Sequence, residues 1–385
     1  MEIDSRAEKL ADLVLDYSLG AGPGDRLLVQ SDPAFEHYAF LVGDGAKQRG
    51  AEVKYDFESH DPAIRRCFLE NCESSGWDGE LVRRKELASW CNKRILVDCD
   101  SNPNYAEGIE DSEVKMGNFS KHVVGPYKDI LYRTDKDGMF EVKWNLVGFP
   151  YRAGADIAGM TLEDYADFVY SATIGNDWEK MIEDMGKVKQ VFDNAEKVRI
   201  VVPGLTDLSL SLRDRGGEVC DGRYNMPDGE VCYGPVEDSL NGHIYFQCPT
   251  KRAGFGVLEG IRLDFENGVI KDFSAKTNQR ALEETLKIPG AKQIGELGIG
   301  CNAGIQKITL ETLFDEKIGG TIHLALGDSF GQPLDAGGGL NKSDIHWDII
   351  CDLRKNLENL AEFPGGEIYV DGKLIQKDGI WKFTA

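Results

Sequence analysis

The sequence predicts an α/β N-terminal domain with a mostly parallel sheet, followed by an α+β C-terminal domain. Helix-like and strand-like segments alternate over the first hundred residues, which is typical of a parallel sheet covered by helices. The second half instead carries strand-like segments and Asn-Gly or Asp-Gly pairs, which favour tight hairpin turns between antiparallel strands.

The N-terminal elements follow from hydrophobic spacing. Leu10, Leu13, Val14 and Tyr17 recur at the period of a helix. The same reading predicts helices over 5–19, 34–49 and 62–73, strands over 26–30, 51–57 and 95–98, and a long helical region over 161–195. Because a new apolar strand opens at Val198, we expect domains at 1–195 and 196–385.

The C-terminal half reads as antiparallel sheet with little helix. The segments 257–265 and 319–326 are strand-like, and 279–287 is the clearest helix. Hairpin turns are expected at Asn241-Gly242, Asn267-Gly268, Asp371-Gly372 and Asp378-Gly379.

Charge and composition exclude several classes of function. The 385 residues include 66 acidic and 44 basic side chains, a formal net charge of -22. A nucleic acid or an anionic membrane needs a basic face, so neither is an expected partner. The polar start at Met1 and the lack of a long apolar run predict a cytoplasmic protein without a membrane span. Nine cysteines without a C-x-x-C pair indicate reduced thiols.

Two of the six histidines lie close together near the C-terminus, at His323 and in His346-Trp347-Asp348. On an extended segment, His346 and Asp348 point to the same face because strand side chains alternate. Imidazole and carboxylate are the usual ligands of zinc and related divalent metals.

Three further carboxylates stand near glycines, where the chain turns tightly. Glu230 and Glu296 lie in Gly-flanked settings, and Glu316 shortly precedes Gly319-Gly320. Two histidines and four carboxylates exceed what one tetrahedral metal needs, and they would suit a pair of metals that share a carboxylate.

Several ordered motifs carry a family resemblance. They are Asn225-Met226-Pro227-Asp228-Gly229-Glu230-Val231, Gly295 to Gly300, Leu313 to Lys317, Gly320 to Gly327 and His346-Trp347-Asp348. In these motifs the chain resembles the thermophilic metallopeptidase family of aminopeptidases, the aminopeptidase T and aminopeptidase S type. The resemblance implies a metal-binding C-terminal catalytic domain, a homodimer, and hydrolysis of peptides that have a free N-terminus.

The resemblance also implies a site. The metal ligands would be Glu230, Glu296, Glu316, His323, His346 and Asp348, around two divalent ions such as zinc, cobalt or manganese. Glu296 is expected to bridge the ions, and Glu316 is the candidate carrier of the proton from water to the leaving amine. Where the family has a tyrosine, this chain has Phe330, so a phenolic donor would be missing.

Two alternatives stay open. The two histidines also match another kind of site. His323, His346 and Asp348 are the residue types of the two-histidine, one-carboxylate triad in non-haem iron ring-cleaving dioxygenases, whose fold resembles that of the same family. The Phe330 departure also allows a metal-binding homologue with weakened catalysis. A single iron site, however, has no need of Glu230, Glu296 and Glu316.

Overall fold

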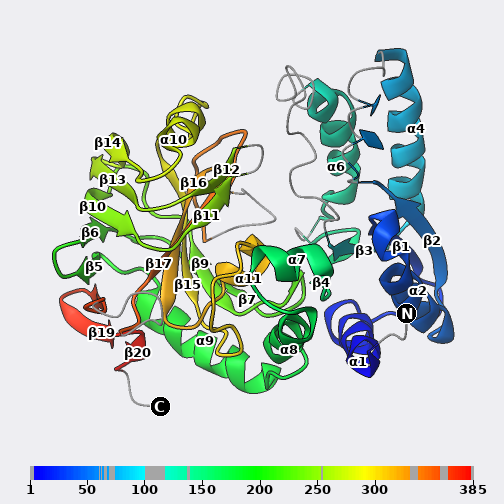
Figure 1. The fold of residues 1–385 in the computed structure, drawn as a ribbon, viewed down its shortest axis with the longest axis horizontal. Helices are drawn as coiled ribbons and strands as arrows, with labels where there is room; N and C mark the ends of the chain where they lie inside the picture. The colour runs from blue at the N-terminus through cyan, green and yellow to red at the C-terminus, as the bar shows by residue number, and fades with distance from the viewer. Residues whose placement is uncertain are drawn as a thin grey trace. The chain divides into compact units, whose positions relative to one another are not determined.

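The computed structural model describes residues 4–59, 61, 63–64, 67–68, 74–99, 118–136, 139–252, 255–329, 337–355 and 363–382 (Figure 1). The chain divides into two compact units. The first comprises Met1–Ile174 with Gly222–Pro227, and the second Gly175–Asp221 with Asp228–Ala385. The domain boundary at 195/196 stays a prediction. No helix among the described residues is long and apolar enough to cross a membrane.

The first unit is built on a parallel sheet with the strand order β2-β1-β3-β4-β8 (Figure 1). The strands are β1 Arg26–Ser31, β2 Glu52–Phe57, β3 Lys93–Asp98, β4 Lys143–Gly148 and β8 Asn225–Met226. Their mutual pairings are parallel. The chain places β2 on one side of β1 and β3 on the other, so the topology reverses between β1 and β3.

The first unit also contains the helices α1 Ser5–Leu13, α2 Glu36–Gln48, α4 Ser74–Trp90, α6 Gly125–Leu131, α7 Arg152–Ile157 and α8 Leu162–Ala172, with the shorter η1 Val14–Ser18, η2 Pro33–Phe35 and η3 Ser120–Val124. Helices α2 and α4 contact strand β1 of the sheet. Leu28 of β1 is buried with Ala88 of α4 and Tyr127 of α6. These two helices therefore cover the face of the sheet to which Leu28 points.

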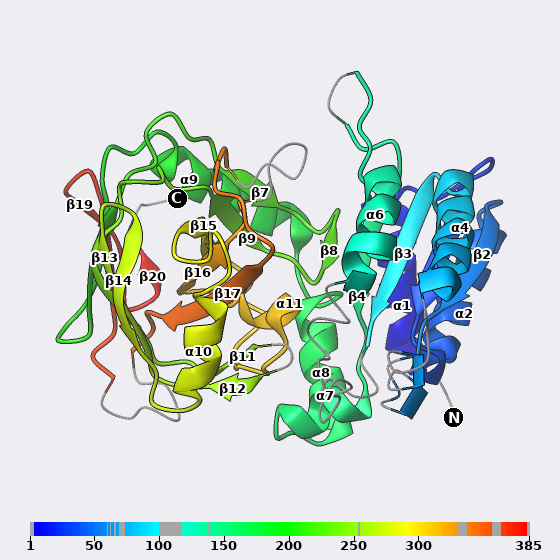
Figure 2. The same ribbon diagram turned by 90° about the horizontal axis from the view of Figure 1, so that it is seen from above.

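The second unit contains a large antiparallel sheet in the order β14-β13-β10-β6-β5-β18-β19-β20 (Figure 1). Figure 2 shows its strands β13 and β14 side by side. Its strands are β5 Val198–Val202, β6 Thr206–Leu210, β10 Asn241–Phe246, β13 Ile261–Glu266, β14 Val269–Ser274, β18 Glu367–Val370, β19 Lys373–Lys377 and β20 Ile380–Trp381. The unit also contains α9 Trp178–Phe192, α10 Gln279–Thr285, α11 Thr312–Asp315 and the small ribbon of β11 Thr250–Arg252 and β12 Gly256–Leu258.

A second antiparallel sheet of this unit has the order β17-β16-β15-β9-β7. Its strands are β7 Glu218–Cys220, β9 Glu230–Tyr233, β15 Ile294–Gly300, β16 Thr321–Gly327 and β17 His346–Asp352. Every residue of β15 and β16 is buried. Strand β17 also contacts β10 of the larger sheet, on the face to which Cys351 points. Glu230, Glu296, His323 and Asp348 of the smaller sheet are also buried, so these polar side chains lie inside the unit.

The predicted fold class is confirmed, with local corrections. The turns at 267–268, 371–372 and 378–379 join successive strands, and each pair has positive φ at both residues. Asn241-Gly242 is not a hairpin turn but the start of β10. The single strand expected over 257–265 is two strands, because Gly260 has φ +60° and breaks the extension.

Two helical predictions also need correction. The region 161–195 contains α8 and α9, separated by an interruption at 173–177. The helix expected over 62–73 falls largely outside the described residues, and the sequence reading missed α4.

Candidate metal centre

Strand register gathers the predicted residues on one face of the five-stranded sheet. Gly327 pairs with His346, and Ala325 pairs with both Asp348 and Glu296. Gly298 pairs with His323, and Gly300 pairs with Glu230. Partners across a ladder share a face, so Glu230, Glu296, His323, His346 and Asp348 all point the same way. The same-face prediction for His346 and Asp348 is confirmed.

These five side chains form two tight groups that share Glu296. In the first, ligand atoms of Glu230, Glu296 and His323 lie within 4.8 Å of one another. In the second, those of Glu296, His346 and Asp348 do the same. One oxygen of Glu296, Oε1, lies 3.0 Å from Nε2 of His323, and the other, Oε2, lies 3.7 Å from Nε2 of His346. Glu296 thus faces one imidazole with each oxygen.

Backbone carbonyls orient both imidazoles. His323 Nδ1 lies 3.1 Å from the carbonyl oxygen of Glu316, and His346 Nδ1 lies 2.7 Å from that of Asp328. Since a carbonyl only accepts, each Nδ1 carries the proton that it donates. Each neutral ring then presents the lone pair of Nε2 to the carboxylates, which is the arrangement of a metal-ligating histidine.

Those facing atoms are mutually repulsive unless something positive stands between them. An Nε2 lone pair 3.0 Å from Glu296 Oε1 places two acceptors in contact. In addition, Glu230 Oε2 and Asp348 Oδ1 are buried and make no hydrogen bond with the described residues. Either protons or metal cations must supply the missing charge. The donor set of imidazole nitrogens and carboxylate oxygens fits divalent cations.

Lys317 belongs to this side-chain cluster, although the sequence did not predict it as a site residue. Its side chain is fully buried, with Nζ 3.3 Å from Glu230 Oε1 and also in contact with the carboxylate of Glu316. Burial alone would lower the pKa of Lys317, but the charges of Glu230 and Glu316 raise it above its ordinary value. The ammonium therefore stays charged and holds two of the predicted ligands. In the sequence, only its position directly after Glu316 could have indicated that Lys317 lies in this cluster.

The pKa values express how tightly the charges are packed. Burial raises the pKa of Glu230 to about 7 and that of Glu316 to about 7, although Lys317 opposes both shifts. Burial would lower the pKa of His323 and of His346, yet neighbouring carboxylates raise each to about 10. Without a metal, the carboxyl groups and imidazoles with these raised pKa values would bind protons instead.

Glu316 lies at the margin of the cluster rather than in either tight group. It follows α11, keeps 14% of its side chain exposed, and is joined to Glu230 through Lys317. Its neighbour Asp315 has a different use. Asp315 accepts hydrogen bonds from the backbone of Thr309 and Leu310, both 2.8 Å long, and so fixes the preceding loop.

Gly298 makes room for the first histidine. A Cβ at this position would lie 1.9 Å from Cε1 of His323, so any side chain would displace the ring. Phe330 lies outside the described residues. A third group, Cys220, Asp228 and Glu230, also has ligand atoms within 4.8 Å of one another.

Two bacterial aminopeptidases are similar in sequence to this chain over nearly its full length. Aminopeptidase 2 of Geobacillus stearothermophilus is 28% identical over 411 residues, covering 98% of this chain and 95% of the relative. Aminopeptidase AmpS of Bacillus subtilis (strain 168) is 23% identical over 437 residues, covering 99% of this chain and 100% of the relative.

Two solved structures share the fold. Wild-type AmpT from Thermus thermophilus superposes with a TM-score of 0.78 at 20% identity, covering 98% of each chain. A 2,5-dihydroxypyridine dioxygenase from Pseudomonas putida KT2440 gives 0.58 at 13% identity, covering 99% of this chain and 98% of the other. Residues 3–381 match the thermophilic metalloprotease (M29) family. The predicted family is therefore confirmed: this chain belongs to the thermophilic metalloproteases and is a metal-dependent peptide hydrolase.

Proposed function

We propose that the chain is an aminopeptidase whose centre holds two divalent ions. The observation that carries this proposal is the position of Glu296, each of whose oxygens faces the Nε2 atom of a different histidine. The aminopeptidases named above are its relatives over nearly their full length, which supports removal of N-terminal residues as the reaction.

The charge of the centre supports two ions rather than one. With neutral imidazoles, the carboxylates of Glu230, Glu296, Glu316 and Asp348 face the single ammonium of Lys317, so three negative charges lack a partner. Burial makes such an excess costly unless cations balance it. One ion would fit between Glu230, Glu296 and His323, and another between Glu296, His346 and Asp348.

The chain's own groups would bind and orient the substrate. Two bound ions would polarise the scissile carbonyl and lower the pKa of a bound water. A carboxylate of the cluster would hold the ammonium of a free N-terminus, so blocked peptides would bind poorly. Glu316 is the proposed carrier of the proton to the leaving amine, because it is partly exposed and burial raises its pKa to about 7.

We expect a low kcat, because Phe330 lacks the hydroxyl group of the family's tyrosine. A phenol at this position would donate a hydrogen bond to the developing oxyanion, and loss of one such donor commonly costs about 10²–10³ in rate. Phe330→Tyr should therefore raise kcat and leave KM nearly unchanged. Steady-state kinetics of both forms on one aminoacyl amide, at saturating metal, measure this. An unchanged kcat would mean that another group already supplies the donor or that the centre is a weakened homologue.

A second candidate is a mononuclear iron dioxygenase. His323 Nε2 and His346 Nε2 lie 3.7 and 3.2 Å from Asp348 Oδ1, which suits a single triad. The fold is also shared with a 2,5-dihydroxypyridine dioxygenase. Burial of Glu296 in the same cluster favours the hydrolase, because a single ion in the triad leaves this carboxylate without a counter-charge, whereas Glu230 has the ammonium of Lys317 at 3.3 Å.

Metal content and substrate choice test the proposal together. We expect about two zinc, cobalt or manganese ions per chain, hydrolysis of leucine amide, and no hydrolysis of N-acetylleucine amide. One iron per chain with oxygen uptake on a dihydroxypyridine would identify the dioxygenase instead. Equal rates on free and blocked substrates would exclude an aminopeptidase. We further propose a cytoplasmic homodimer, which gel filtration and cell fractionation measure.

A further inference from the structure

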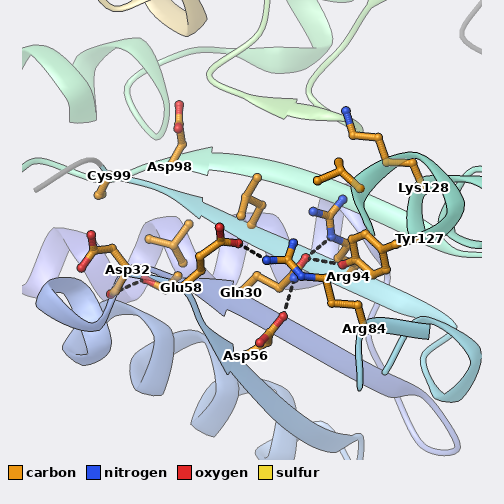
Figure 3. A pocket seen from close by; sticks show the side chains of 14 residues that line it. Gln30, Asp32, Asp56, Glu58, Arg84, Arg94, Asp98, Cys99, Tyr127 and Lys128 are labelled. Carbon is orange, nitrogen blue, oxygen red and sulfur yellow. Dashed lines mark hydrogen bonds and ion pairs between the residues drawn. The ribbon is translucent and has the colours of Figure 1, made fainter. Parts of the chain in front are cut away.

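A cavity of about 230 Å³ lies within the first unit, at the reversal of its parallel sheet (Figure 3). Its walls come from the carboxyl-terminal parts of β1 and β2, from β3 between Arg94 and Asp98, and from α4, η3 and α6. Open parallel sheets bind small ligands at this place, where strands on either side lead the chain in opposite directions. Every lining residue belongs to the first unit, so the cavity is separate from the candidate metal centre.

A hydrogen-bonded network fixes the floor of the cavity. Gln30, only 7% exposed, donates from Nε2 to Asp56 Oδ2 at 2.8 Å. Its Oε1 accepts from Tyr127 Oη at 3.0 Å and from Nε of Arg94. Since the amide nitrogen must face Asp56, the amide oxygen must face Arg94 and Tyr127. Arg94 is thus held by one nitrogen, and its side chain has a set orientation.

Two other charged side chains that line the cavity, Arg84 and Asp56, already have partners of opposite charge. Arg84 bonds Glu58 at 2.8 Å and Glu80 at 2.6 Å, and Asp56 receives a second bond from Arg83 at 2.6 Å. By contrast, the terminal nitrogens of Arg94 and the ammonium of Lys128 make no hydrogen bond or ion pair with the described residues. These two cations therefore have their charges available to a ligand.

Two carboxylates stand at the opposite side. Figure 3 shows Asp32 and Asp98 on one side of the cavity, and Arg94, Tyr127 and Lys128 on the other. Gln30 pairs with Leu96, so Asp32 and Asp98 follow at neighbouring ends of β1 and β3. Leu96 and Val124 contribute apolar surface to the cavity. The cavity thus has a cationic side, an anionic side and an apolar wall.

The spacing along β3 gives the scale of a ligand that would span these sides. Arg94 and Asp98 are four residues apart on one strand and share a face, a Cα separation of roughly 13 Å. An extended dipeptide is roughly 7 Å long, and a hydrogen bond at each end adds about 3 Å. A single α-amino acid is too short.

We propose that this cavity binds a small zwitterion of dipeptide length, with its carboxylate at Arg94 and Lys128 and its ammonium at Asp98 and Asp32. A dipeptide and an ω-amino acid share this chemistry. The proposal depends only on the first unit and not on the proposed function of the metal centre.

Calorimetric titration of the metal-loaded chain with 5-aminopentanoate tests the proposal. This probe has four carbons between its charged groups, as many chain atoms as diglycine, and no peptide bond to cleave. We expect saturable binding that is at least about tenfold tighter than for pentanoate, pentylamine or glycine, because each of these lacks one charge or the length. Equal binding of pentanoate would show a simple anion site and overturn the proposal, as would no binding of 5-aminopentanoate.

Variants locate the binding. Arg94→Gln should weaken it about tenfold or more, while the exposed Arg133→Gln should not. Should Arg94→Gln fail to fold, Lys128→Gln against Lys121→Gln supplies the same comparison at two exposed lysines. Glu296→Gln should bind the probe normally. Loss of binding in Glu296→Gln, or full binding in both cavity variants, would place the probe elsewhere and overturn the proposal. Titration of Glu296→Gln with glycylleucine then distinguishes a dipeptide site from one restricted to ω-amino acids.

Discussion

Both units contain carboxylates beside a sheet, but they balance the charge differently. In the first unit, the buried Asp56 lies 2.6 Å from Arg83 and the partly exposed Glu58 lies 2.8 Å from the buried Arg84. In the second unit, Glu230, Glu296 and Asp348 are met chiefly by imidazoles and by one lysine. Guanidinium keeps its charge at any physiological pH, whereas an imidazole can exchange its proton for a metal ion.

This difference separates buried charge that stabilises a fold from buried charge that binds something. The carboxylates of the first group are neutralised by arginines that stay charged, so these pairs need no further ligand. Carboxylates opposite imidazole lone pairs are satisfied only by a proton or a metal ion. The two groups should therefore respond differently to metal, to pH and to loss of the basic partner.

The largest contrast is expected from loss of one carboxylate in each unit. Glu296→Gln should lower kcat/KM by at least about 10³ and remove most bound metal, because an amide cannot balance two cations. The fold should persist. Glu80→Gln, which removes a partner of Arg83 and Arg84, should leave metal content unchanged. Elemental analysis and amide hydrolysis measure both, and full metal content in Glu296→Gln would contradict the shared-ligand assignment.

Loss of the basic partner should come next in size. Lys317→Met leaves two buried carboxylates without their ammonium and should cost about 3–5 kcal/mol of unfolding free energy in the metal-free protein. Added metal should reduce that loss, because cations replace the missing charge. Arg84→Met should destabilise the protein equally with and without metal. Denaturant titrations of both variants, each with metal and with chelator, make the comparison. A metal-independent loss in Lys317→Met would mean that Lys317 serves the fold alone.

The same contrast explains what the sequence could predict. Alternation predicted strands of the parallel sheet, and hairpin dipeptides predicted turns of the eight-stranded antiparallel sheet, since these signals are local. His346-Trp347-Asp348 predicted a shared face because a strand has a two-residue period. The ligand set itself came from motifs, and the structure places five of its six members together.

Other features depend on contacts between distant segments. Lys317 meets Glu230 across 87 residues, and only the fold reveals that pair. Gly298 accommodates His323 because two strands pair in one register. The cavity between Arg94 and Asp98 depends on which strands become neighbours and on the placement of α6. No spacing within the sequence specifies these.

A pH series on the metal-free protein should show a moderate effect. The folded-state pKa of Glu230 and of Glu316 is raised from 4.5 to about 7, and that of His323 and of His346 from 6.5 to about 10. A raised folded-state pKa stabilises the protein below the unfolded value, and this stability is lost as the pH rises through the folded value. The metal-free melting temperature should thus fall by about 5 °C or more between pH 6 and pH 9.

Metal should abolish that pH dependence, because it replaces the protons of the centre. Calorimetric scans of the metal-loaded and metal-free chain at each pH measure the difference. In the first unit, burial would raise the pKa of Glu80, but bonds from Arg83 and Arg84 lower it, so this group stays ionised across the whole range. A metal-free protein that is more stable at pH 9 than at pH 6 would contradict the proton-filled centre.

The smallest effect is expected from adding one methyl group beneath His323. In Gly298→Ala the new Cβ would lie 1.9 Å from Cε1 and 2.1 Å from Nε2 of that ring, so the imidazole must turn away from Glu296. Moving one ligand without removing it should weaken metal binding about 10- to 100-fold, the size seen when the support of a ligand is lost. Gly186→Ala in α9 is the matched control, because its Cβ meets no atom within 4 Å and alanine favours a helix. Metal titrations against a competing chelator measure both affinities. An unchanged affinity in Gly298→Ala would mean that Nε2 of His323 is not a ligand, which would leave only the group around His346 and Asp348 and favour a single ion.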